Sequence, residues 1–182
     1  PLPWMPAKSV TGEWIEGYRH WFGAPYQAFS HQGCRFVLVN SPAFNSGLRF
    51  EAEQRQWLEA ELASHAGERL LVATHYPPYL LHPREPSSYD NLDEPARGWF
   101  LELLERHKAE ALFVGHVHNF FYTLHAWRPW HPGEAAEGMD FYALPSTSFV
   151  RRDYSELFRI APGTEQEYGR NDAGKLGYFL VD

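Results

Sequence analysis

Two segments of the chain carry apolar residues at the spacing of an amphipathic helix. The first, Glu51 to Ser64, has Trp57, Leu58 and Leu62 on one face and charged residues on the others. The second, Pro95 to His107, repeats this pattern and opens with a proline, which suits the first turn of a helix. The spacing therefore predicts two helices that each bury one face.

Short apolar runs bounded by turn residues predict the strands. We expect a hairpin from Tyr26 to Ser30 and Cys34 to Asn40. Further strands are predicted at Arg69 to Thr74, Glu110 to Gly115, Phe120 to Trp127, Met139 to Leu144 and Lys175 to Val181. Residues 1 to 24 predict an irregular lead-in with one short helix. Because strands and helices alternate along the middle of the chain, the pattern favours an α/β fold in a single domain, 1–182.

Composition narrows the class of protein. The chain has 182 residues, of which 44% are hydrophobic, enough to bury one core. No apolar run approaches the ~20 residues of a membrane-spanning helix, so we expect no membrane partner. The formal net charge of -7 argues against nucleic acid, which recruits clustered Lys and Arg. The single cysteine, Cys34, is typical of a reducing compartment and predicts a cytoplasmic protein.

Histidines follow two of the predicted strands. Thr74-His75-Tyr76-Pro77-Pro78 comes after one, and Gly115-His116-Val117-His118 ends the next, with the glycine expected to let the backbone turn. In α/β sheets the carboxyl ends of parallel strands meet at one edge, so His75, His116 and His118 are predicted at one rim. Neutral imidazole is a good ligand for Zn, Fe and Mn. The pattern therefore predicts a metal site.

These two histidine motifs resemble the last two signature motifs of the calcineurin-like metallophosphoesterases. The segment Glu53 to Leu58 resembles that family's Gln-x-x-Trp-Leu helix, and the whole resemblance covers Tyr18 to Leu144. It implies a layered α-β-β-α sandwich with two central sheets. It also implies two divalent metal ions (Mn, Fe or Zn) that activate a water for attack on phosphorus. His75 and His116 would share one ion, and His118 would hold the second.

The family's three upstream motifs, Asp-x-His, Gly-Asp-x-x-Asp and Gly-Asn-His-Asp/Glu, are absent from these 182 residues. We therefore expect the chain to be the carboxyl-terminal portion of a longer metallophosphoesterase, missing the first strands and helices of the sandwich. Three histidines without a bridging aspartate predict a partial or empty metal site. The chain alone is then expected to have little or no activity, and no catalytic residue is assigned within it.

The substrate-binding candidates are Tyr76, Asn119 and Arg151. Tyr76 and Asn119 border the predicted rim, and Arg151 belongs to an arginine pair that can clamp phosphate. The long loop Tyr79 to Asp93 and the insertion Trp127 to Gly138 are expected to wall the rim. Such walls favour a small phosphomonoester or phosphodiester over long DNA or a phosphoprotein.

Two other interpretations stay open. A metal-free structural or interaction domain would keep the histidines for packing and hydrogen bonds. A mononuclear metal enzyme of the β-barrel type also uses a His-x-His pair. It usually needs a glutamate a few residues after the pair, and Asn119 to Trp127 contains none. A phosphoesterase therefore remains the leading hypothesis.

Overall fold

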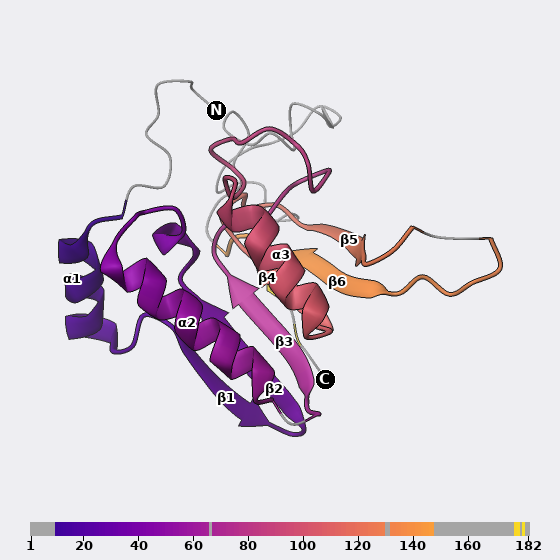
Figure 1. Cartoon of the computed structure of the whole chain (residues 1–182). Helices are drawn as coiled ribbons and strands as arrows, with labels where there is room; N and C mark the ends of the chain where they lie inside the picture. Colours follow the sequence, from indigo (N-terminus) through magenta and orange to yellow (C-terminus); the bar gives the residue numbers. More distant parts are fainter. Residues whose placement is uncertain (1–9, 66, 130–131, 148–176, 179, 181–182) are drawn as a thin grey trace.

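A computed structural model describes residues 10–65, 67–129, 132–147, 177–178 and 180. Its centre is a six-stranded sheet in the order β1-β2-β3-β4-β6-β5 (Figure 1). The strands are β1 (Gln27–His31), β2 (Cys34–Val39), β3 (Arg69–Thr74), β4 (Ala111–Val114), β5 (Phe121–Ala126) and β6 (Gly138–Ala143). Strands β2, β3, β4 and β6 run parallel, whereas β1 and β5 are antiparallel strands at the two edges. The sheet is therefore mixed, with a parallel centre.

The helices are α1 (Gly12–Phe22), α2 (Arg49–Ala63) and α3 (Ala96–Arg106). Helix α2 connects β2 to β3 and α3 connects β3 to β4, the crossovers that parallel neighbours need. Both helices pack on one face of the sheet (Figure 1), where Leu58 of α2 and Phe100 of α3 are fully buried in one apolar cluster. The predicted helices of 51–64 and 95–107 are thus confirmed to within two residues.

Alternation along the strands decides which side chains form this core. Val37, Val72 and Leu112 point to the helices and are fully buried. The residues between them face the other side of the sheet, where Phe113 and Tyr142 stack at 5.4 Å between ring centroids and are half-buried. The α/β prediction is confirmed. The described residues form one sheet with one helix layer, and the second sheet of the expected sandwich stays a prediction.

The predicted strands of 26–30, 34–40, 69–74, 110–115, 120–127 and 139–144 are all present. The predicted strand of 175–181 lies largely outside the described residues, and Gly177, Tyr178 and Leu180 are in no strand. Within the described part of the chain, none of the helices combines the length and apolar character needed to span a lipid bilayer.

The insertion of 127–138 does not wall the histidine rim. It joins the end of β5 to the start of β6, and β6 is parallel to β4. Its described residues therefore lie at the end of the sheet opposite to the carboxyl ends of β3 and β4, as Figure 1 shows. The Trp127 amide donates to the Glu137 carbonyl at 3.1 Å and extends the hairpin there. The prediction was wrong because apolar spacing does not reveal the direction of a strand.

A buried polar pair connects strand β5 with the long loop that follows β3. The Tyr79 hydroxyl and Nδ1 of His125 are 2.9 Å apart, and both side chains are buried. Burial lowers the pKa of His125, and nearby Glu105 opposes this only in part. The imidazole is therefore neutral in the folded chain at pH values where an exposed histidine binds a proton.

Acidification should destabilise the chain through His125. Below the ordinary histidine pKa of about 6.5, the unfolded chain takes up a proton that the folded chain excludes. The free energy of unfolding therefore decreases as the pH decreases. Urea denaturation between pH 7.5 and 5.5 should show a smaller pH dependence for His125→Gln than for the unsubstituted chain, by up to about 1.4 kcal/mol per pH unit. His31→Gln, at an exposed position, is the control. Equal pH dependence in all three chains would refute this role.

Candidate metal centre

His75 and His116 meet at the carboxyl ends of the adjacent parallel strands β3 and β4. The Gly115 amide donates to the His75 carbonyl at 3.0 Å and continues the ladder by one bond. Beyond this bond the two rings approach each other, with Nδ1 of His116 at 3.2 Å from Nε2 of His75. His75 is exposed, and His116 is only 6% exposed. The pair thus has one buried ring and one ring open to solvent.

The spacing and tautomer of this pair fit two ligands of one metal ion. Ligand bonds from histidine nitrogen are about 2.1 Å long, so two ligands on one ion lie roughly 3 to 3.5 Å apart. Nε2 of His116 is 3.0 Å from the Tyr89 carbonyl, which can only accept a hydrogen bond. Nε2 therefore carries the hydrogen, and the lone pair of Nδ1 faces His75.

The backbone at the second histidine motif is strained. His116 has a φ of 68° and His118 a φ of 57°, in the left-handed region that side chains other than glycine rarely adopt. The Val117 amide donates to the Gly115 carbonyl at 2.8 Å, which closes a tight turn around His116. Gly115 itself has no positive φ, so the turn that the sequence assigned to the glycine is made at His116. Strain of this kind clusters at functional sites.

Two residues of the long loop, Tyr89 and Asp90, also belong to the site. Besides the Tyr89 carbonyl, Oδ1 of Asp90 lies 3.8 Å from Nε2 of His116, and Asp90 is fully buried. A carbonyl or carboxylate behind the ring is the usual partner that orients a metal-binding histidine. The sequence carries no spacing signal for these residues, because they come from a loop without periodicity.

The structure brings together two of the three predicted ligands. His118 is half-buried on the same turn as His116. Among the described residues, no group of three or more His, Cys, Asp and Glu side chains has an arrangement that could hold a metal ion. His75 and His116 are therefore the part of the predicted centre that the described residues bring together.

The three substrate-binding candidates have different surroundings. Tyr76 is buried, with its ring 4.3 Å from that of His116, and its amide donates to the Ser41 hydroxyl at 2.8 Å. The Asn119 side chain donates to the Val117 carbonyl at 2.7 Å and supports the histidine turn. Arg151 lies outside the described residues. A role of Tyr76 and Asn119 in binding substrate stays a prediction.

Gln54, in the Gln-x-x-Trp-Leu segment of α2, clamps the neighbouring strand end. Its side chain accepts from the Asn40 amide at 2.9 Å and donates to the Asn40 carbonyl at 3.0 Å, and it is fully buried. The clamp holds the end of β2 beside His75. Asn40 and His75 line a cavity of about 480 Å³ whose other wall includes Trp14 of α1. This cavity gives the exposed side of His75 an apolar border.

Comparison with known proteins gives two relatives with the same name. The zebrafish (Danio rerio) serine/threonine-protein phosphatase CPPED1 is 30% identical over 115 residues, which cover 60% of this chain and 37% of that protein. The mouse (Mus musculus) protein of that name is 26% identical over 171 residues, covering 86% of this chain and 54% of that protein. The chain thus spans about half the length of these relatives, or less. No family model matches it.

Among solved structures, GAP50, the anchor in the inner membrane complex of Plasmodium, matches with a TM-score of 0.50 and 14% identity over 71% of this chain and 39% of that chain. This likeness concerns the fold alone. The names of these two sequence relatives agree with the resemblance of the histidine motifs to the metallophosphoesterases.

Proposed function

We propose that this chain supplies the histidine part of the metal centre of a phosphoesterase. The approach of His116 Nδ1 to His75 Nε2, at 3.2 Å on adjacent strand ends, is the observation that carries the proposal. His75 and His116 would hold one of two divalent ions (Mn, Fe or Zn), and His118 would contribute to the second. Such ions, when bound, supply an activated water and neutralise the phosphoryl oxygens.

The chain's own residues have distinct tasks in this proposal. The Tyr89 carbonyl fixes the His116 tautomer, and the buried Asp90 carboxylate favours the proton on Nε2. The exposed ring of His75 leaves its side of the pair open to substrate and water. The names of the two CPPED1 relatives support phosphoester chemistry rather than a metal-free interaction domain.

We further propose that the remaining ligands, above all a bridging carboxylate, lie in protein chain outside these 182 residues. Two facts support this: the chain spans only 37% and 54% of its two relatives, and its described residues offer no third ligand to the histidine pair. Reading the encoding gene upstream of Pro1 tests the proposal. Asp-x-His and Gly-Asp-x-x-Asp motifs in that reading frame are the expected result, and a start codon directly before Pro1 would contradict it.

For the substrate, a small phosphoester stays the prediction, resting on the loop of 79–93, which does reach the histidines. The insertion of 127–138 no longer supports it. The relatives are named for action on phosphoserine and phosphothreonine in proteins, so a phosphopeptide is the second candidate.

Activity should depend on the full-length protein and on metal. With Mn²⁺ or Zn²⁺, we expect the full-length protein to hydrolyse p-nitrophenyl phosphate or a nucleotide, and a chelator to abolish this. The 182-residue chain alone should show no turnover, because two histidines without a bridging carboxylate hold metal weakly. A phosphoserine peptide and duplex DNA complete the panel. If the full-length protein hydrolyses none of these substrates, the proposed function is refuted. Chelator-sensitive turnover by the 182-residue chain would refute the proposal that ligands lie outside it.

A further inference from the structure

The loop that carries Tyr89 and Asp90 to His116 is held by one carboxylate. The segment 75–95 contains no helix or strand, so its backbone amides need other acceptors. Glu85 supplies them: its Oε1 accepts from the Leu80 amide at 2.8 Å, and its Oε2 accepts from the amides of Leu81 and His82 at 2.9 and 3.2 Å. Three consecutive amides thus converge on a single side chain.

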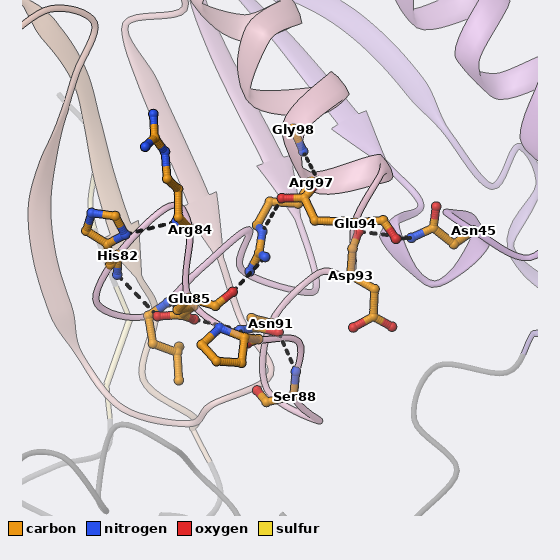
Figure 2. A network of polar contacts seen from close by, with 12 residues as sticks. Asn45, His82, Arg84, Glu85, Ser88, Asn91, Asp93, Glu94, Arg97 and Gly98 are labelled. Carbon is orange, nitrogen blue, oxygen red and sulfur yellow. Dashed lines mark hydrogen bonds and ion pairs between the residues drawn. The ribbon is translucent and has the colours of Figure 1, made fainter.

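Asn91 links this carboxylate to the part of the loop next to His116. Its side chain donates to Oε1 of Glu85 at 2.6 Å and to the Pro86 carbonyl at 2.9 Å, and it accepts from the Ser88 amide at 2.8 Å (Figure 2). Asn91 is fully buried, so these bonds are shielded from water. They enclose residues 86 to 91, and the Tyr89 carbonyl and Asp90 lie inside this enclosed turn.

Helix α3 anchors the same loop from the other side. Arg97, which is 3% exposed, donates from Nη2 to the Glu85 carbonyl at 2.7 Å and from Nε to Glu94 at 2.9 Å (Figure 2). Glu85 is therefore held through both its side chain and its backbone. Hydrogen bonds therefore fix the loop to helix α3 and give it a defined position relative to His116.

We propose that Glu85 is a positioning residue of the metal centre, which holds the Tyr89 carbonyl against Nε2 of His116 and so keeps Nδ1 available to a metal ion. The effect of Glu85 on metal affinity rests on the proposed function. Its effect on the His116 tautomer can be measured in the chain without metal. The Glu85 side chain accepts from the amides of residues 80–82 and from Asn91, and it acts on His116 indirectly. Its effect passes through Asn91 and the turn that contains Tyr89.

The test replaces Glu85 by glutamine, which has the same size. One carboxylate oxygen that accepts from backbone amides is then an NH₂ group, which cannot accept a hydrogen bond. In the 182-residue chain, nitrogen-proton NMR correlation should show His116 with its hydrogen on Nε2, and Glu85→Gln should replace this by a mixture of tautomers. Mn²⁺ titration of the full-length protein should show a 10- to 100-fold weaker affinity in the variant, the range found for outer partners of metal ligands. Glu94→Gln, which removes the charge that pairs with Arg97 but leaves every bond to the Glu85 side chain in place, should change neither readout.

Two further measurements keep the test decisive if Glu85→Gln does not fold. Asn91→Asp is isosteric and removes both donated bonds, so it should cause the same loss of a single tautomer. In the unsubstituted chain, the amides of Leu80, Leu81 and His82 should exchange their hydrogens at least about tenfold more slowly than those of an unstructured peptide. An unchanged tautomer in both variants, or unprotected amides, would overturn the inference. Failure of the unsubstituted full-length protein to bind Mn²⁺ would instead refute the proposed function, while the tautomer still decides the role of Glu85.

Discussion

Replacing His116 by asparagine in the full-length protein is expected to weaken divalent-metal binding at least about 100-fold and to reduce phosphoester hydrolysis accordingly. Loss of outer partners alone costs metal centres 10- to 100-fold, and loss of a direct ligand costs at least as much. Asparagine is chosen because it tolerates the positive φ of 68° at this position, so the turn is kept while the imidazole is removed. Metal titration and steady-state kinetics with p-nitrophenyl phosphate measure the two effects.

His75→Ala should have a comparable effect, since His75 provides the other nitrogen of the pair. His65→Ala is the matched control: His65 lies beside His107, with 6.4 Å between ring centroids, and is part of neither histidine motif. Full metal affinity in His116→Asn would show that the metal ion binds elsewhere and that the His75–His116 contact is a structural hydrogen bond.

The largest expected loss of stability follows Phe100→Ala. Phe100 is fully buried at the centre of α3 and packs against Phe44 at 5.5 Å between ring centroids. Removing a fully buried phenyl ring leaves a cavity, and such substitutions cost about 3–5 kcal/mol. Urea unfolding should show this as a lower midpoint with an unchanged slope.

Phe22→Ala is the control for this substitution, because Phe22 is 74% exposed and its loss should cost little. A loss below about 1 kcal/mol for Phe100→Ala would mean that Phe100 is not packed in the core of the folded protein.

Periodicity predicted the fold well where one face of an element is buried. Leu58 and Phe100 stand on helical stripes, and the apolar runs that end in Thr74 and Val114 are short and bounded by polar residues. The meeting of His75 with His116 follows from parallel strands of one sheet, which the alternation of strands and helices already predicted.

The remaining features depend on geometry that a residue pattern does not encode. The left-handed turn at His116 contradicts local preference and is imposed by the surrounding structure, so propensity pointed to Gly115 instead. Tyr89 acts through its backbone carbonyl, which every residue possesses, and no side-chain motif reveals it. The direction of the β5–β6 hairpin depends on pairing between strands distant in sequence.

In the proposed metal centre, His75 and His116 bind the same divalent ion. Crystals of the full-length protein grown with Mn²⁺ or Zn²⁺, with diffraction recorded on both sides of the metal's absorption edge, test it most directly. We expect an anomalous peak within about 2.0–2.3 Å of both Nε2 of His75 and Nδ1 of His116. A metal ion bound elsewhere, with the two rings still joined by their hydrogen bond, would contradict it.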